Sequence, residues 1–213
     1  YMTQSAIFYG LQEYEQSASY LEEAIEQIST NPFWAATYRM NLAAIYSELG
    51  DQVKALQSNR TAWEWLRKQT TALTENSSMV LHNFGIIFSD LGELDSAQVY
   101  LEQMLQWRKE NTPHNAQLIA KTQYDLAKVY LWQDKIEDTQ KLLEQSGTYY
   151  DEEYPSFHPE LTKFELVRAK YYEQTRQYHK MLEAAHVVVL STLASVKDHP
   201  LDWSPSPLET RLK

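Results

Sequence analysis

The sequence predicts an all-α protein in which about five helical hairpins stack into a solenoid, and three observations support this fold class. Tyr46, Phe88, Tyr130 and Tyr172 follow one another at a constant interval of 42 residues. Around each of them, apolar and small residues recur at three- and four-residue spacing, which is typical of helices that bury one face. Five Gly and seven Pro among 213 residues are too few for an all-β fold with many tight turns. Because a hairpin cannot bury its apolar face alone, repeated hairpins favour a stacked array.

The clearest copy of the repeat, HNFGIIFSDLGELDSAQVYLEQML, covers residues 82–105. Its first helix is expected to pack through an apolar stripe that consists of Phe84, Gly85, Phe88 and Leu91. The other face of this helix is then expected to be exposed, and it carries His82, Asn83, Ile86 and Ser89.

Each first helix is expected to end in a turn that leads into a second helix. Gly50 and Gly92 provide the conformational freedom for this turn in two copies. Asp134 and Arg176 replace them in later copies, so we expect the later turns to be less well defined. The second helices carry a small or short residue where two helices approach, namely Ser17, Ala55, Ala97 and Thr139, with Met181 as the exception.

The predicted repeats form a single domain over residues 1–197, with limits of about 1–31, 32–74, 75–112, 113–154 and 155–197. The first copy is degenerate and aligns when Phe8 takes the aromatic position. A Pro-containing tail follows at 198–213, and it is open whether it is a linker, a cap or a segment that fills a groove. We favour a docked cap because the ends of solenoids need to be covered. The chain begins with Tyr1, so we expect it to be a piece of a longer protein.

The order of large-small pair, aromatic residue, Leu-Gly and small residue in FGIIFSDLGELDSAQVYLEQML resembles the tetratricopeptide repeat. The interval of 42 exceeds the roughly 34 residues usual for that repeat. This longer form resembles the repeats of kinesin light chains and of bacterial regulators, whose joints often read like FHPEL at 157–161. The resemblance covers residues 1–197 and implies a right-handed superhelix. The alternatives are a non-repeating helical bundle with accidental spacing and, less consistent with the pattern, Leu-rich or HEAT-type repeats.

Composition and motifs argue against several classes of function. The chain has no Cys and a formal net charge of -10, which exclude thiolate chemistry and make nucleic acid an unfavourable main partner. No apolar stretch is long enough to cross a bilayer. The sequence has no HExxH motif, no Gly-rich phosphate loop and no GxSxG elbow. None of its six His is paired with another at three- or four-residue spacing, so we expect every His at the surface or in a joint. We therefore expect a cytoplasmic protein without membrane attachment, cofactor, metal or catalytic activity of its own.

The resemblance implies that the first helices line a concave groove in which peptides lie. The residues expected there are Met40, Asn41, Ala44, His82, Asn83, Ile86, Ser89, Lys121, Tyr124, Lys128, Lys163 and Lys170. Asn41 and Asn83 match an Asn that holds the main chain of the ligand in related repeats, and an amide suits this because it both donates and accepts. The alternative, a hydrogen bond from the Asn to a neighbouring hairpin, is equally consistent. Met40, Ala44, His82 and Ile86 stand where a carboxylate clamp for chaperone tails needs polar and basic residues, which argues against that ligand.

Four Lys add a charge pattern to the expected groove. Lys121 and Lys128 are seven residues apart and so share one helix side, and Lys163 and Lys170 repeat the arrangement 42 residues later. In an acidic chain, such a strip would attract an acidic peptide or a carboxylate. The alternative is that these are ordinary solvated Lys.

These patterns predict a non-catalytic scaffold module that binds a protein or peptide and forms the regulatory part of a larger bacterial-type protein. The alternative is a peptide-sensing domain that controls an attached effector, such as a Ser/Thr kinase or a transcription regulator. The oligomeric state is left open by the sequence.

Overall fold

A computed structural model describes residues 1–28, 31–70, 72–155 and 158–198. Over these residues the chain is helical without any strand, which confirms the all-α prediction. It divides into two compact units, which are residues 1–146 and 147–213. The predicted tail lies outside the described residues from 199 onward. The helices are α1 (Met2–Gly10), α2 (Tyr14–Gln27), α3 (Pro32–Glu48), α4 (Gln52–Gln69), α5 (Glu75–Asp90), α6 (Leu94–Asn111), α7 (Ala116–Trp132), α8 (Ile136–Glu153), α9 (Pro159–Gln174) and α10 (Tyr178–Asp198).

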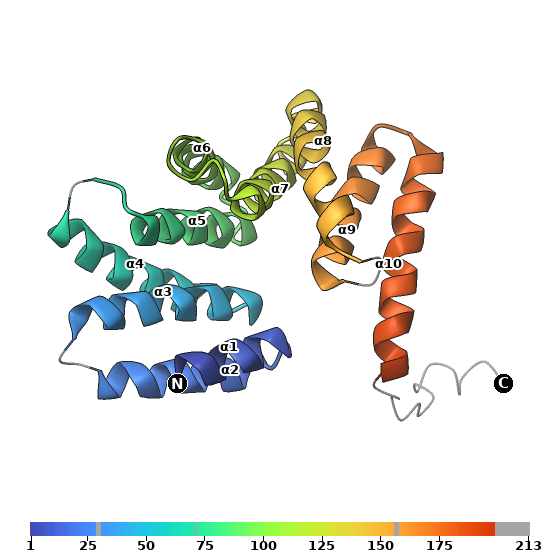
Figure 1. Ribbon diagram of the computed structural model, residues 1–213. Coiled ribbons are helices and arrows are strands. Elements are labelled where there is room, and N and C mark those ends of the chain that lie inside the picture. Colours follow the sequence, from blue (N-terminus) through green and yellow to red (C-terminus); the bar gives the residue numbers. More distant parts are fainter. Residues whose placement is uncertain (29–30, 71, 156–157, 199–213) are drawn as a thin grey trace. The chain divides into compact units, whose positions relative to one another are not determined.

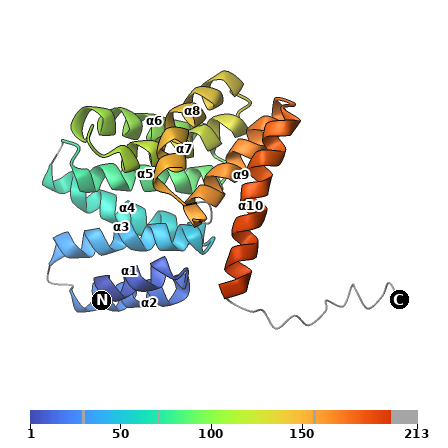
Figure 2. The same cartoon turned by 45° about the vertical axis from the view of Figure 1, so that its right-hand side comes forward.

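The helices of the first unit stack in chain order (Figure 1). Hairpin partners pack together in the pairs α1 with α2, α3 with α4, and α5 with α6, and each hairpin also packs on the next through α2 with α3, α4 with α5, and α6 with α7. The first helices α3, α5 and α7 contact one another as well, so they form a continuous layer. Figure 2 shows the same order from a second direction. This layer carries most of the residues that the sequence places in a binding groove.

All five turns between the two helices of a hairpin have the same backbone geometry. A residue in the left-handed region stands in each turn, at Gln12, Gly50, Gly92, Asp134 and Arg176, with φ between 58° and 78°. The next residue donates its N–H to the carbonyl of the repeat's aromatic residue, as from Glu93 to Phe88 at 2.9 Å and from Lys135 to Tyr130 at 2.9 Å. This is the hydrogen bond that closes a helix C-terminus in a Schellman motif.

The expectation that the later turns would be less well defined is therefore wrong. Asp134 and Arg176 adopt the left-handed conformation at a cost of about 1–2 kcal/mol each relative to Gly. The backbone hydrogen bond to Tyr130 or Tyr172 forms regardless of the side chain in the turn. The same bond from Glu13 to Phe8 shows that Phe8 does occupy the aromatic position of the first copy.

Small residues allow the paired helices to approach closely, as the sequence predicts. Ser17, Ala55, Ala97 and Thr139 are fully buried. In the third hairpin the closest approach involves Gly85, because a Cβ at this position would lie 2.5 Å from Cγ of the buried Leu101. Leu91 was expected in the packing stripe, but this prediction is wrong. The residue is 45% exposed, whereas Leu49, at the same position of the preceding copy, packs against the core.

The core of the first unit crosses the borders between hairpins. One apolar cluster joins Leu21 of α2 to Tyr46 of α3 and to Ile87 of α5. Another joins Met40 of α3 to Leu66 of α4 and to Met104 of α6. In the second unit, Phe164 of α9 is fully buried and stacks on Tyr150 of α8 with ring centroids 4.3 Å apart.

We expect Gly85→Ala to lower the free energy of unfolding by about 1–2 kcal/mol, because the added methyl group would displace Leu101 from a filled space. This loss outweighs the gain of about 1 kcal/mol that Ala brings to a helix interior. Urea denaturation measures the difference.

Gly147→Ala in α8 is the control for that substitution. Its Cβ would lie 3.6 Å from the Phe164 ring, which is an ordinary contact, so this variant should gain stability. A Gly85→Ala protein that is as stable as the wild type would contradict the close approach of α5 and α6.

Candidate functional site

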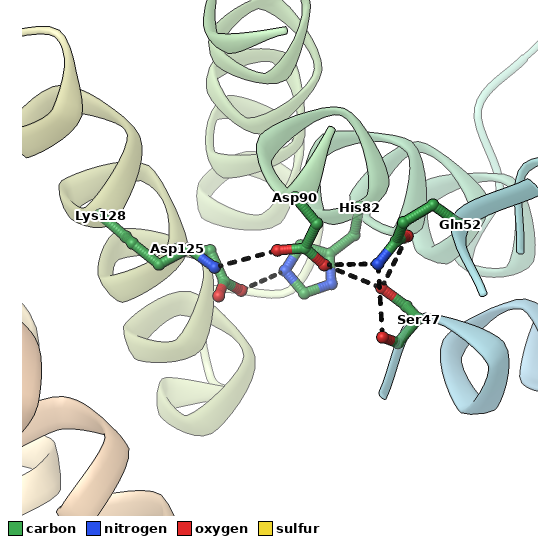
Figure 3. A network of polar contacts seen from close by, with 6 residues as sticks. All are labelled: Ser47, Gln52, His82, Asp90, Asp125 and Lys128. Carbon is green, nitrogen blue, oxygen red and sulfur yellow. Dashed lines mark hydrogen bonds and ion pairs between the residues drawn. The ribbon is translucent and has the colours of Figure 1, made fainter. Parts of the chain in front are cut away.

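A network of polar side chains crosses the layer formed by α3, α5 and α7 (Figure 3). It consists of Ser47 at the end of α3, Gln52 at the start of α4, His82 and Asp90 on α5, and Asp125 and Lys128 on α7. Two parts can be distinguished, one centred on Asp90 and the other on Asp125.

The Asp90 carboxylate accepts hydrogen bonds from three other helices. Ser47 Oγ donates to Oδ2 at 3.0 Å, and Gln52 Nε2 donates to the same oxygen at 3.3 Å. Lys128 Nζ lies 3.5 Å from Oδ1 and 5.0 Å from the centroid of the Trp132 ring. One side chain of α5 therefore ties together α3, α4 and α7.

His82 and Asp125 form a buried pair between α5 and α7. His82 Nε2 lies 2.7 Å from Asp125 Oδ2, and both side chains are less than a tenth exposed. Burial lowers the pKa of the His82 imidazole more strongly than the Asp125 carboxylate raises it. His82 is therefore neutral at pH 7, with the proton on Nε2 that it donates to Asp125.

Asp125 is the charged member of this pair. Burial alone would raise the pKa of its carboxyl group, but the hydrogen bond from His82 and the positive charges of Lys121 and Lys128 outweigh that effect. The pKa consequently lies below its ordinary value, and the carboxylate is ionised at neutral pH.

Arg108 of α6 adds a further positive charge near Asp125. The side chain is buried, and its Nη1 donates to the Leu118 carbonyl at 2.9 Å and to the Thr122 hydroxyl. Burial lowers the pKa of the guanidinium to about 10, against the opposing effect of Asp125, so Arg108 stays protonated at pH 7. The sequence analysis did not select Arg108. The repeat register indicates that position 108 is buried, because the apolar residues Leu66 and Tyr150 stand 42 residues before and after it, and both are buried in the structure.

A side-chain contact to the preceding first helix recurs at the same repeat position in two successive hairpins. Asn83 and Asp125 occupy the same position in successive copies, and each reaches back to the preceding first helix. Asn83 Nδ2 donates to the Met40 carbonyl at 2.9 Å, while Asp125 accepts from the side chain of His82. Asn83 thus makes the hydrogen bond to a neighbouring hairpin that the sequence analysis kept as the alternative to ligand binding. Asn41 has no side-chain hydrogen-bond partner among the residues that the structure describes.

Three of the residues that the sequence places in the groove are buried. Met40 belongs to an apolar cluster, His82 pairs with Asp125, and Ser89 is covered although its Oγ has no hydrogen-bond partner within the described ranges. Their predicted exposure was wrong, because Met40 packs against α4, α5 and α6, and Asp125 of the next first helix covers His82. The expectation that every His lies at the surface or in a joint fails for the same reason at His82. The partly exposed groove residues on α3, α5 and α7 are Asn41, Ala44, Asn83, Ile86, Lys121, Tyr124 and Lys128.

The four Lys of the predicted strip divide between the two units. Lys128 pairs with Asp90, whereas Lys121 has no ion-pair partner in the described part of the chain. In the second unit, Lys163 pairs with Glu160 at 3.4 Å and Lys170 with Glu173 at 2.7 Å, both on α9 itself. A continuous basic strip through all four stays a prediction.

Among the described residues, no group of three or more His, Asp or Glu side chains could hold a metal ion. None of the described helices is both long and apolar enough to cross a membrane.

Solved structures of low sequence identity share this fold. BtubC (BKLC) from P. vanneervenii matches with a TM-score of 0.66 and 14% identity, over 95% of this chain and 80% of that chain. A kinesin light chain protein from Podosopora anserina with nearly identical TPR-like repeats matches with a TM-score of 0.61 and 16% identity. The match covers 92% of this chain and 93% of that chain. The Rap conjugation gene regulator of the plasmid pLS20, in complex with the Phr peptide, matches with a TM-score of 0.70 and 17% identity, over 93% of this chain and 53% of that chain.

No family model and no curated protein matches the sequence. The fold is a helical solenoid of tetratricopeptide-like repeats, which confirms the resemblance to kinesin light chains and bacterial regulators.

We expect His82→Leu to lower the free energy of unfolding by about 3–5 kcal/mol, because it leaves the buried Asp125 carboxylate without its hydrogen-bond donor. The double variant His82→Leu/Asp125→Leu should recover most of that loss, since replacing both partners of a buried hydrogen bond by apolar side chains often changes stability little. Chemical denaturation of the wild type, the two single variants His82→Leu and Asp125→Leu, and the double variant provides the double-mutant cycle. Losses that simply add would show that the two residues are not coupled.

Stability should also fall on mild acidification. The pKa of His82 is lower in the folded chain than the ordinary 6.5 of an unfolded one, so below pH 6.5 the unfolded state binds the proton first. Protonation of Asp125 also lowers stability, but only below pH 3.8, the ordinary pKa of its carboxyl group. We expect wild-type melting temperatures to drop more between pH 7.5 and 5.5 than those of His82→Gln, which keeps a donor but does not titrate. Parallel curves for the two proteins would exclude His82 as the source.

Proposed function

We propose that the layer of α3, α5 and α7 binds an extended peptide or a segment of a partner protein, and that the chain acts as a non-catalytic scaffold module. The observation that carries this proposal is the partly exposed set of groups on three adjacent helices above a fixed polar network. Preorganised groups bind more tightly because less side-chain freedom is lost on association.

Asn41 is the group best suited to hold the main chain of a peptide. Its amide can both donate and accept, and it has no side-chain partner among the described residues. Asn83, the equivalent residue of the next copy, is already engaged with the Met40 carbonyl. Main-chain recognition is therefore expected at α3, and Ile86 of α5 offers an apolar contact beside it.

The α7 end of the layer favours an acidic group on the ligand. Lys121 lies close enough to His82 and Asp125 to influence the pKa of both, and it has no ion-pair partner in the described ranges. Lys128 and the buried Arg108 add positive charge, against the carboxylates of Asp125 and of Asp90, the partner of Lys128, so three cations stand against two carboxylates. In a chain with a net charge of -10, this local excess of cations would attract a carboxylate.

A peptide-sensing role for a larger regulator is the second candidate. It is favoured by the similarity to the Rap regulator, which was solved with a peptide and of which this chain spans about half. In that case the bound peptide would change an attached effector domain, such as a Ser/Thr kinase or a transcription regulator. An effector encoded in the same reading frame would support sensing, whereas further repeats would support scaffolding.

Peptide display against the full chain, followed by titration of a selected acidic peptide, tests the binding face. We expect Asn41→Ala and Lys121→Glu each to weaken binding about tenfold, which corresponds to about 1.4 kcal/mol. Lys109→Glu on the exposed surface of α6 is the matched charge control and should leave the affinity unchanged. Added salt should weaken binding in the wild type and less so in Lys121→Glu.

Equal affinities for Asn41→Ala, Lys121→Glu and Lys109→Glu would place the binding site elsewhere. Selection of basic peptides alone would contradict the expected acidic ligand while leaving peptide binding itself intact.

A further inference from the structure

A pocket of about 320 Å³ lies in the first unit where α3 begins, α4 ends and α5 begins, and Figure 1 shows these three helix ends on the same side. Its described lining includes none of the groups assigned to the proposed peptide site. Phe33 of α3 and Trp65 of α4 line it with ring centroids 5.9 Å apart and ring planes at 69°. The buried Leu66 lies beside them. Two aromatic rings at a steep angle therefore form part of the pocket wall.

The repeat explains only one of the two rings. An aromatic residue recurs at the position of Trp65 in the next two copies, and Trp65 packs against an apolar cluster of the core. The equivalents of Phe33 in the later copies are Glu75, Gln117 and Pro159. Stacking of hairpins therefore does not require an aromatic residue at position 33. Phe33 and the adjoining Trp34 are each more than two-fifths exposed, so the aromatic group is open to another molecule.

The polar side chains of the same pocket carry oxygen atoms that the protein does not use. Gln69 of α4 and Glu75 and Asn76 of α5 belong to its lining. None of the three side chains has a hydrogen-bond or ion-pair partner among the residues that the structure describes. The pocket thus combines two rings with one carboxylate and two amide oxygens that can accept hydrogen bonds.

The charge around the pocket favours a cation. The last turn of α4 and the first turn of α5 meet there, so the negative end of one helix dipole opposes the positive end of the other. Arg67 and Lys68 also stand in the last turn of α4, but neither is among the described lining residues. Arg67 lies instead over the Trp63 ring, 5.4 Å from its centroid. The carboxylate of Glu75 therefore decides the sign of the pocket, and the net charge of -10 acts in the same direction.

We propose that this pocket binds the guanidinium group of an Arg side chain from a partner protein. A guanidinium is planar, stacks on aromatic faces and carries five N–H donors without any acceptor. It therefore matches two rings and three unused groups of oxygen atoms at once. The ammonium group of Lys has no flat face and is more strongly hydrated, whereas a trimethylammonium group would leave the oxygen atoms without donors.

The size of the pocket suits a side chain that projects from a larger partner. Sites for small molecules usually have volumes of about 300–1,000 Å³ and bury most of the ligand. This pocket is at the lower end of that range, and Phe33 and Glu75 in its wall are exposed. It can cover the tip of a side chain, while the rest of the partner stays outside.

Nuclear magnetic resonance of the full chain tests the proposal through the indole N–H signals of its six Trp. The signal that Trp65→Phe removes identifies Trp65. We expect Nα-acetyl-argininamide to shift this signal with a millimolar dissociation constant. The constant should be about threefold higher for Nα-acetyl-lysinamide and about tenfold higher for Nα-acetyl-citrullinamide, which keeps the shape of Arg without its charge.

Phe33→Leu and Glu75→Gln should each weaken binding of the arginine probe about fivefold, because one removes a ring and the other the negative charge. Both residues are exposed, so these variants stay folded. Glu64→Gln is the matched control. It removes an exposed carboxylate of α4 outside the described lining and should leave the affinity unchanged.

Three results would overturn the proposal. Equal affinities for the arginine and citrulline probes would show that charge does not matter. Tighter binding of the lysine probe would show that the pocket does not select a flat group with many donors. Equal losses in Glu75→Gln and Glu64→Gln, or an unchanged Trp65 signal, would show that the probe binds elsewhere on the acidic surface.

Discussion

Polar contacts tie the first helices α3, α5 and α7 to one another in the first unit. Asn83 makes this tie by donating to the Met40 carbonyl, and Asp125, at the same position one repeat later, makes it by accepting from His82. Asp90 reinforces it by bonding to Ser47 on one side and Lys128 on the other. Apolar contacts alone would allow neighbouring hairpins to slide, because they have no direction. These polar contacts specify which residues must meet.

The same polar ties bear on the proposed preference for an acidic ligand. The buried carboxylate of Asp125 needs positive charge or donors around it, and Arg108, Lys121, Lys128 and His82 supply them. The carboxylates of Asp90 and Asp125 offset two of the three positive charges of Arg108, Lys121 and Lys128. The structural requirement of a buried charge and the proposed preference for an acidic ligand therefore have a common origin.

The repeat interval allowed the hairpins, their turns and the small residues between paired helices to be predicted from sequence. Exposure of single side chains was predicted less well, because spacing within one helix does not show what the next hairpin covers. His82 and Ser89 were expected on the face opposite the packing stripe, yet both are buried, and His82 pairs with Asp125 of the next first helix. Conversely, Leu91 fits the apolar pattern but is 45% exposed. Arg108 was missed because its burial follows from its repeat position and not from its polarity.

The turns show what is kept when the copies of a repeat diverge. Gln12, Gly50, Gly92, Asp134 and Arg176 have little in common as side chains, but the backbone around each is alike. Since the closing hydrogen bond joins main-chain atoms, substitution at this position alters the strain without changing where the helix stops. Mutations at the left-handed position can therefore accumulate, and the turn at Gln12 keeps its geometry even though it lies 38 residues before Gly50 and not 42. What the copies keep is then the backbone of the turn, and they can lose their likeness in sequence without losing it.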